Sequence, residues 1–311
     1  MKVAIFDLGS NTTKLLVAEV VDRGCPQVVA EESRACRLTA GGGEKFSFAE
    51  ESIDRLLAVL GELMEIARDH EVDRMKAVAT DAFRKSENSQ ELIALAQASL
   101  GLPISVLTGL EEAGAIAAGL LSDPSIARFD DFHAIDLGGG SMEVIAVNDR
   151  VVSALESLPL GAAVLSERFC PDASFEWPDS VRLEARDYVA SLLGASSSRE
   201  LPRSQACAAL VGSGGSLVFL REILAVEGGV EAEEKSVLKI SEADNLFERI
   251  SSMSLAERTE NYPSLPAARA DIFPAGLLVV SEVMSYFKQT QIIHSYRNLR
   301  HGIAIGLAMK G

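Results

Sequence analysis

Two stretches of the sequence decide the fold: VAIFDLGSNTTKLLVAEV at residues 3–20 and HAIDLGGGSMEVIAVND at residues 133–149. Each has the pattern of an apolar strand, an Asp-Leu-Gly turn with small polar residues, and a second apolar strand. The aspartates of the two turns, Asp7 and Asp136, are 129 residues apart, which is about the length of one domain. One such hairpin is weak evidence, whereas two of them, each at the head of a domain-sized segment, predict a chain of two related domains.

The composition is that of an ordinary folded protein. The chain has 311 residues, of which 48% are hydrophobic and 24% charged, and its formal net charge is −16. This length suits two domains of about 150 residues each. No apolar run approaches the ~20 residues that span a bilayer, and Asp7 interrupts the stretch that a secretory signal would need. We therefore expect a cytoplasmic protein that does not bind membranes.

Charge and residue types also exclude several classes of function. A general nucleic-acid binder needs a clustered basic face, which the acidic balance of this chain does not favour. The four cysteines form no CxxC and the four histidines no HExxH, so neither a zinc site nor a disulfide framework is indicated. A small or flexible anionic ligand stays compatible, because backbone amides, local cations and a divalent metal can reverse the field within one site.

The periodicity between and after the two hairpins predicts a mixed α/β chain. Ser47-Phe48-Ala49-Glu50 matches a capping box, and apolar residues at helical spacing follow from Ile53 to Ala67. Further helices are expected over 89–100, from about 111, over 178–193, 215–225, 241–252 and 271–287, and from about 299. Further strands are expected over 75–79, 104–107, 208–211 and 290–294. The stretch 196–204 is interpreted as a surface loop.

The two Asp-Leu-Gly turns have the residue types of a phosphate site. Small residues let backbone N–H groups form a concave row around phosphate oxygens. The residues concerned are Gly9, Ser10, Asn11, Gly138, Gly139, Gly140 and Ser141. An aspartate beside each turn could hold a divalent cation, usually through water for magnesium. For either turn alone, a hairpin that only shapes the fold is an equal alternative, and the presence of both favours phosphate.

With GSGGS at 212–216, the pair resembles the phosphate-1, phosphate-2 and nucleoside loops of the actin / Hsp70 / sugar-kinase superfamily. Within it, the chain resembles the exopolyphosphatase / guanosine pentaphosphate phosphohydrolase family in a short two-domain form. This narrower resemblance rests on stretches that run in family order: VATDAFRKSEN (78–88), TGLEEAGAIAAGL (108–120), DLGGGSMEV (136–144), ARADIFPAGLLVV (268–280) and SYRNLRHGIAIGL (295–307). It implies two ribonuclease-H-like α/β domains, residues 1–120 and 121–311, with a cleft between them and the final helix packing back toward the first domain.

The resemblance also assigns catalytic carboxylates. The family's catalytic glutamate lies in its Gly-x-Glu-Glu-Ala segment and aligns with Glu112, which would orient and deprotonate a water for in-line attack on a terminal phosphorus. Glu111 is the alternative, and a carboxylate at a helix N-terminus is also favoured by the dipole without any catalysis. Glu143 stands where the family has a glutamate near the metal and water, although an outward-facing strand residue is possible there.

The remaining expectations concern the metal and the phosphate contacts. A magnesium or manganese ion is expected at Asp7, Asp136 and Glu143. Beside the turn residues, the expected phosphate contacts are Lys14, Arg37, Arg84, Gly212, Ser213 and Gly214. We expect the cationic side chains of Lys14, Arg37 and Arg84, together with Lys45 and Lys85, to converge on one face of the cleft. The loop at 212–216 either cradles a phosphate or a nucleoside, or only shapes its turn.

Near its end the chain departs from the family pattern. Tyr296 stands where an aspartate is common, Asn298 replaces a glycine and His301 a glutamate. His301 is accordingly interpreted as a histidine on a helix surface.

The function implied by the resemblance is magnesium-dependent hydrolysis of the terminal phosphoanhydride of inorganic polyphosphate. Guanosine pentaphosphate is the close alternative substrate, and a homodimer is compatible with the sequence. One rival is a phosphotransferase, for which the sequence offers no clear acceptor base. The other is a phosphate-sensing or filament-forming actin-like module, which would not need Glu112 or Glu143.

Overall fold

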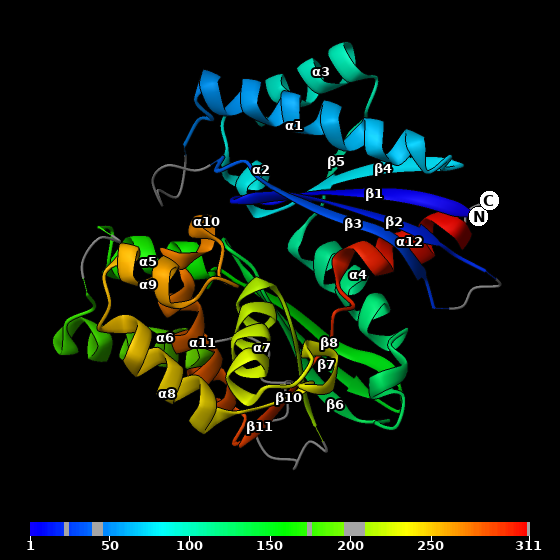
Figure 1. Ribbon diagram of the computed structural model, residues 1–311. Coiled ribbons are helices and arrows are strands. Elements are labelled where there is room, and N and C mark those ends of the chain that lie inside the picture. Colours follow the sequence, from blue (N-terminus) through cyan, green and yellow to red (C-terminus); the bar gives the residue numbers. More distant parts are fainter. Residues whose placement is uncertain (22–24, 39–45, 173–175, 196–208, 310–311) are drawn as a thin grey trace. The chain divides into compact units, whose positions relative to one another are not determined.

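The computed structural model describes residues 1–21, 25–38, 46–172, 176–195 and 209–309 (Figure 1). It divides into two compact units: unit 1 is Met1–Ala127 with Arg297–Gly311, and unit 2 is Arg128–Tyr296. The boundary expected at residue 120 thus lies at residue 127, and the final segment groups with unit 1. Lys45 and the loop expected at 196–204 lie outside the described residues. No helix in the described ranges is long and apolar enough to cross a membrane.

Unit 1 is built on a five-stranded sheet in the order β3-β2-β1-β4-β5. Its strands are β1 (Lys2–Leu8), β2 (Thr12–Glu19), β3 (Gln27–Ala35), β4 (Arg74–Ala79) and β5 (Ile104–Val106). The first three strands are antiparallel, whereas β4 and β5 run parallel to β1. The carboxyl ends of β1, β4 and β5 therefore lie at one edge of the sheet, which is where α/β proteins place ligands.

Helices cover both faces of this sheet (Figure 1). They are α1 (Glu50–Asp69), α2 (Asp81–Lys85), α3 (Ser89–Leu100), α4 (Gly109–Leu121), the 3₁₀ turn η1 (Pro124–Ile126) and α12 (Leu299–Met309). The apolar residues of α1 and α3 are three and four positions apart and form one core with Phe6 and Leu8 of β1. On the other face, Ala304 of α12 packs against Val3 and Ile5 of β1.

The start of α1 differs from the expectation. Glu50 is the first helical residue and Ala49 is the N-cap, with no side-chain cap bond, so the predicted Ser47–Glu50 capping box is wrong. The chain is instead fixed here by Asn88, whose side chain accepts from the N–H of Phe48 at 2.8 Å and donates to its carbonyl at 3.0 Å.

Helices α4 and α12 cross at backbone distance. A Cβ on Gly302 of α12 would lie 1.8 Å from the carbonyl oxygen of Ala115, and one on Gly119 of α4 would lie 2.2 Å from that of Asn298. Only glycine fits at either position. The last helix of the chain is thereby packed onto unit 1.

His301 is buried rather than on the helix surface as predicted, and its ring caps the start of α12. Its Nδ1 accepts from the backbone N–H of Asn298 at 3.3 Å, while the Asn298 side chain accepts from the N–H of Arg300 at 3.1 Å. The arrangement resembles a capping box, except that the Asn298 side chain binds the N–H of the second helical residue and not of the third. Burial, helped by the charges of Arg297 and Arg300, lowers the pKa of His301 to about 2, so the ring is neutral and can accept.

Unit 2 repeats the strand order of unit 1. Its sheet runs β10-β11-β9-β6-β7-β8, so that β8-β7-β6-β9-β11 corresponds to β3-β2-β1-β4-β5 and β10 is added at the edge. The strands are β6 (Phe132–Leu137), β7 (Met142–Asn148), β8 (Val151–Leu158), β9 (Leu210–Ser213), β10 (Val237–Lys239) and β11 (Gln291–His294). The predicted α/β fold with two related domains is confirmed.

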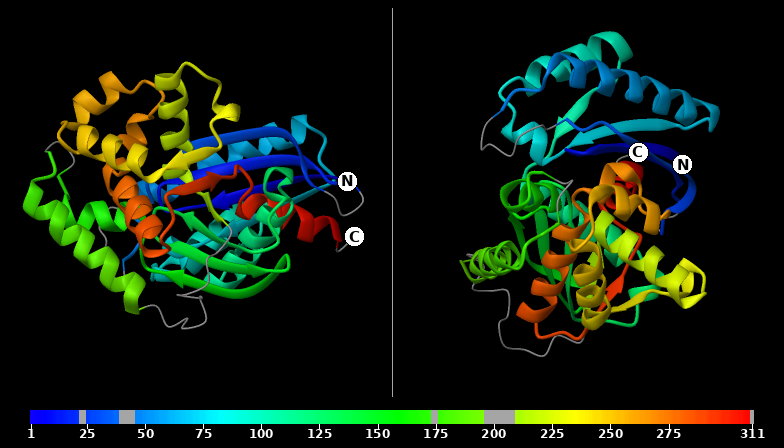
Figure 2. Two further views of the ribbon diagram at one scale, coloured as in Figure 1. Left: turned by 90° about the horizontal axis from the view of Figure 1, so that it is seen from below. Right: turned by 60° about the vertical axis from the view of Figure 1, so that its left-hand side comes forward.

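The helices of unit 2 pack around one buried helix. They are α5 (Ala162–Phe169), α6 (Asp179–Ala195), α7 (Gly215–Gly228), the 3₁₀ turn η2 (Ala232–Glu234), α8 (Ile240–Ser251), α9 (Leu255–Asn261), α10 (Ala267–Ala270) and α11 (Phe273–Tyr286). Helix α11 is apolar along most of its length and contacts α5, α6, α7 and α8 (Figure 2). It buries the core that holds the carboxyl edge of the second sheet in place.

Candidate active site

The two Asp-Leu-Gly hairpins have the same geometry. In β1–β2 the last paired residues are Leu8 and Thr13, and the N–H of Gly9 donates to the carbonyl of Thr12 at 3.1 Å. In β6–β7 the last pair is Leu137 and Met142, and the N–H of Gly138 donates to the carbonyl of Ser141 at 3.0 Å. Each hairpin therefore has a four-residue turn, closed by the same hydrogen bond.

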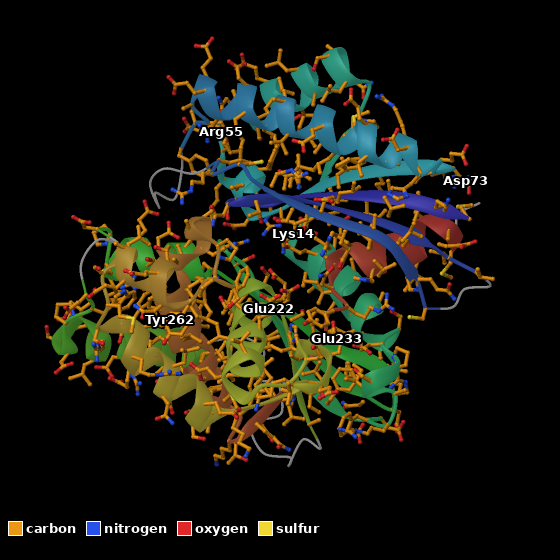
Figure 3. All side chains as sticks on the ribbon, viewed as in Figure 1. Lys14, Arg55, Asp73, Glu222, Glu233 and Tyr262 are labelled. Atoms are coloured by element: carbon orange, nitrogen blue, oxygen red, sulfur yellow. The ribbon has the colours of Figure 1, made fainter. Side chains whose placement is uncertain are left out.

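The first turn is held by the chain that follows β3. The N–H groups of Cys36 and Arg37 donate to the carbonyl of Asn11 at 2.9 and 3.0 Å, and that of Leu38 donates to Ser10 at 2.8 Å. Arg37 adopts a left-handed φ of 42°, which bends the chain around the turn. Arg55 of α1, labelled in Figure 3, donates to the carbonyl of Cys36 at 2.8 Å. The structure thus brings Arg37 against the turn.

The second turn is held in the same way by the chain that follows β8. The N–H groups of Ala162 and Ala163 donate to the carbonyls of Gly138 and Gly139 at 3.0 and 2.9 Å. A Cβ on Gly161 would lie 2.2 Å from the Gly139 oxygen, so this approach requires glycine. No backbone carbonyl of the described residues accepts from the N–H groups of Gly139 and Gly140. The carbonyls of Gly138 and Gly139 are hydrogen-bonded within the protein, and the N–H groups of Gly139 and Gly140 are of the kind that binds an anion.

Asp136 and Glu143 are paired directly across β6 and β7, so their side chains project from the same face of the sheet. Glu143 is 2% exposed and accepts from the hydroxyl of Ser157 at 2.8 Å. The alternative of an outward-facing strand residue is therefore wrong. Sequence reasoning missed Ser157, because β8 was not predicted and a bulge between Ala146 and Val147 shifts the register, so that counting from the turn would place Glu156 opposite Glu143.

The donor set in unit 2 fits a magnesium ion. Mg²⁺ is usually bound through one or two carboxylates, with waters and substrate phosphates as its other ligands. Asp136 and Glu143 provide two carboxylates, and the described ranges contain no group of three or more His, Cys, Asp or Glu residues suited to a metal. In unit 1, Asp7 lies opposite Lys14, not opposite a second carboxylate.

The two adjacent glutamates of α4 have different environments. Glu111 is exposed and closes a capping box: it accepts from the N–H and the hydroxyl of Thr108 at 2.8 and 2.9 Å. These hydrogen bonds, led by the one from the Thr108 backbone, lower the pKa of Glu111. Glu112 is 7% exposed and forms an ion pair with Arg84 at 2.7 Å. Glu111 stabilises the helix start, and Glu112 is the buried acid.

Arg84 is fixed from three sides at the carboxyl end of β4. Its Nη1 donates to Glu112 and, at 2.8 Å, to the carbonyl of Leu107, and its Nη2 lies 3.6 Å from Asp81. Asp81 also binds Lys85 at 2.8 Å. Because β4 lies beside β1, this group occupies the same sheet edge as the first turn. Lys14, labelled in Figure 3, follows Thr13 on β2 and is the second residue after that turn.

Internal packing explains one of the three glycines of the 212–216 loop fully and a second in part. A Cβ on Gly212 would lie 2.4 Å from Leu217 and 2.6 Å from Ile292. Gly214 has a φ of 104°, and its Cβ would lie 2.3 Å from the carbonyl oxygen of Leu137 and 2.8 Å from Asp136 Oδ1. Gly214 must therefore be glycine whether or not a ligand binds, whereas a side chain at Gly212 would only require the ends of two flexible side chains to move, and nothing lies closer than 3.7 Å to the Cβ position of Gly215.

Two side chains beside this loop are polar. Ser213 lies opposite Asp136, is 1% exposed, and its hydroxyl has no hydrogen-bond partner in the described part of the chain. The guanidinium carbon of Arg269 lies 3.7 Å from the Cβ position of Gly215, the first residue of α7. The loop thus adds a buried hydroxyl and a nearby cation to the carboxyl edge of unit 2.

Comparison with known proteins decides the family. A sequence model of the Ppx/GppA phosphatase family matches residues 16–310. The chain belongs to the Ppx/GppA phosphatase family. The crystal structure of the Aquifex aeolicus member of that family is 26% identical, with a TM-score of 0.77 over 100% of this chain and 98% of the other.

A second solved structure matches the fold more closely. An exopolyphosphatase from Cytophaga hutchinsonii is 23% identical, with a TM-score of 0.89 over 100% of this chain and 98% of the other. Membership of the Ppx/GppA family makes the chain a phosphate-releasing hydrolase and confirms the resemblance inferred from the motifs. The family match begins at residue 16, so the assignment of the first turn rests on its structural repeat in unit 2.

Proposed function

We propose that this Ppx/GppA phosphatase hydrolyses the terminal phosphoanhydride of inorganic polyphosphate with a magnesium ion as cofactor. The observation that carries the proposal is the setting of Glu112: a carboxylate buried at the start of α4 and held by Arg84 at the sheet edge that carries the first turn. Arg84 fixes the orientation of the Glu112 carboxylate, as a positioned general base requires, whereas Glu111 is engaged in capping.

Unit 1 would supply the base and most of the cationic contacts. Glu112 takes a proton from the attacking water, while Lys14, Arg37 and the N–H groups of the first turn bind phosphate oxygens. Arg84 orients Glu112 and can offer its remaining N–H groups to a phosphate. Backbone and side-chain donors fixed before the substrate arrives stabilise the charge on the transferring group without reorganising.

Unit 2 would hold the metal and a second set of phosphate contacts. Asp136 and Glu143 are the carboxylates that would bind the cation, and the N–H groups of Gly139 and Gly140 would bind phosphate oxygens. When bound, the ion neutralises phosphate charge and polarises the phosphorus–oxygen bonds. For Asp7 of unit 1 we propose no direct contact with the cation, because Lys14 lies opposite it.

Polyphosphate is favoured over guanosine pentaphosphate by the 212–216 loop. The sequence feature that suggested a nucleoside was the glycine content of this loop, and at Gly214 the left-handed φ and the adjacent backbone of Leu137 require glycine without any nucleoside. A chain of phosphates needs cations and N–H groups but no pocket for a base. A non-catalytic role is less well supported because it would not use the buried Glu112, and phosphotransfer because the family is one of phosphatases.

A phosphate-release assay tests the proposal. Polyphosphates of several lengths, guanosine pentaphosphate and ATP would be compared at equal terminal-phosphate concentration, with and without a chelator. We expect the highest kcat/KM on polyphosphate, loss of activity with the chelator and recovery with Mg²⁺ or Mn²⁺. A higher kcat/KM on guanosine pentaphosphate would transfer the assignment to that substrate. Full turnover in excess chelator would refute the proposal that the reaction needs a metal ion.

A further inference from the structure

Ser157 on β8 completes a row of polar side chains across the unit 2 sheet. The strand ladder pairs Glu143 with Ser157 on one side and with Asp136 on the other, and Asp136 in turn with Ser213. Directly paired residues on neighbouring strands project from the same face of a sheet. Four polar side chains from four strands therefore lie side by side.

Within this row, the carboxylate of Glu143 is held by a hydroxyl. Ser157 Oγ donates to Oε1 of Glu143 at 2.8 Å, and Glu143 is 2% exposed. An ionised carboxylate only accepts hydrogen bonds, so the serine proton points at it. A hydrogen bond to one oxygen restricts the orientation of a buried carboxylate. Carboxylates that bind metals are commonly oriented by such hydrogen bonds from neighbouring residues.

We propose that Ser157 is a positioning residue, which keeps the Glu143 carboxylate in the orientation that binds the divalent cation. The inference rests on the proposed function for the identity of the reaction, but the hydroxyl–carboxylate contact is independent of the substrate. Ser157 itself would touch neither the phosphate nor the water. Its effect would pass through Glu143.

Unit 1 supplies the matched control. The corresponding position on β3 is Ser33, which lies opposite Lys14 and is exposed. A serine there has an ammonium group beside it, so its hydroxyl has no carboxylate to orient. Removing the hydroxyl of Ser33 changes the same residue type, at the same position of the repeated sheet, without touching the metal-binding carboxylates.

The experiment compares Ser157→Ala, Ser157→Thr and Ser33→Ala in the full chain. Binding of Mn²⁺ without substrate is followed by the EPR signal of the free ion, and phosphate release from polyphosphate gives kcat and KM at saturating Mg²⁺. In Ser157→Ala we expect Mn²⁺ binding to weaken by about 10- to 100-fold and kcat to fall at least several-fold, with KM within about twofold. Ser157→Thr, which keeps the hydroxyl, and Ser33→Ala should match the wild type within about threefold.

A double variant separates positioning from packing. If Ser157 acts through Glu143, Ser157→Ala should weaken Mn²⁺ binding by less than about twofold when added to Glu143→Gln. Unchanged Mn²⁺ binding in Ser157→Ala, equal loss in Ser157→Thr, or full additivity in the double variant would overturn the inference. A wild-type protein that binds Mn²⁺ but hydrolyses no phosphoanhydride would refute the proposed function instead, and the Mn²⁺ comparison would still decide the role of Ser157.

Discussion

The same row of four sheet positions carries different chemistry in the two units. In unit 1 the row is Val78–Asp7–Lys14–Ser33, and in unit 2 it is Ser213–Asp136–Glu143–Ser157. The aspartate and the outer serine are shared, while Lys14 is replaced by Glu143 and Val78 by Ser213. One row is electrically balanced and the other carries two carboxylates. A duplicated scaffold thus yields one edge suited to phosphate and another suited to a cation.

The helices that follow corresponding strands differ in a similar way. Helix α4 follows β5 and α12 follows β11, and each starts with a reciprocal cap, Thr108 with Glu111 and Asn298 with His301. The next residue is the buried Glu112 in α4 and Gly302 in α12, where the backbone of α4 leaves no room for a side chain. We therefore expect a catalytic side chain after the cap of α4, which is Glu112, and none at the corresponding position of α12.

The largest effect is expected from the glutamates of α4. Glu112→Gln keeps the shape of the side chain but removes its basicity, so kcat should fall by ~10²- to 10⁴-fold with KM little changed. Glu111→Gln is the matched control and should lower the melting temperature slightly through the weaker cap, with kcat near wild type. The reverse pattern would move the base to Glu111. Normal turnover in both would exclude the proposed mechanism.

The next effect tests the two aspartates of the comparison. Asp136→Asn should raise the Mg²⁺ concentration at half-maximal activity by about 10-fold or more, because it removes one of two paired carboxylates. Asp7→Asn should raise it less, because Asp7 lies opposite a lysine. Equal shifts would show that the balanced row binds the cation as strongly as the acidic one, which would remove the proposed division between the units.

Much of this architecture could be predicted from sequence, because the duplicated hairpin fixes it. The glycine turns and the buried strands β1, β2, β6 and β7 show clear periodicity, and α3 was expected over its observed range. The outer strands β3 and β8 were missed. Six of the nine residues of β3 are exposed, none is buried, and its apolar residues do not alternate, so nothing in its pattern separates it from a loop.

The candidate site was predictable residue by residue but not contact by contact. Spacing and resemblance selected Arg84, Glu112, Asp136 and Glu143, yet the ion pair of Arg84 with Glu112 joins residues from two helices and has no local signal. The burial of His301 was missed because α12 packs on α4 through glycines at positions far apart in the chain. Likewise, Gly214 resembles part of a ligand cradle in sequence, whereas the backbone of strand β6 explains why it must be glycine.

A smaller effect concerns the cations of unit 1. Arg84→Ala would also remove the ion-pair partner of the buried Glu112, so its effect on KM would mix two causes. Arg37, which is held against the first turn, is therefore the better residue for testing phosphate binding. Arg37→Ala should raise KM several-fold more for long polyphosphate than for short, and the difference should shrink at high salt. Arg34→Ala is the control, because Arg34 binds Glu32 and Glu62 on the surface. A KM change that is independent of chain length would favour guanosine pentaphosphate.

The smallest effect distinguishes the two helix caps by pH. The pKa of His301 is about 2 in the folded chain and about 6.5 when unfolded, so its contribution to stability is complete above pH 6.5 and is lost as the pH falls. Between pH 7 and pH 5 this costs about 2 kcal/mol of unfolding free energy. The pKa of Glu111 is lowered from an already acidic value, so its cap is unaffected over that range.

His301→Gln isolates this contribution, because glutamine can accept the same hydrogen bond from Asn298 but does not titrate. Burial also lowers the pKa of His133, so both proteins should lose some stability on acidification. The wild type should lose about 2 kcal/mol more than His301→Gln between pH 7 and pH 5, measured by urea unfolding at each pH. Parallel losses in the two proteins would mean that His301 accepts a proton in the folded state. The cap of α12 would then differ from that of α4 in sequence only, and not in its response to acid.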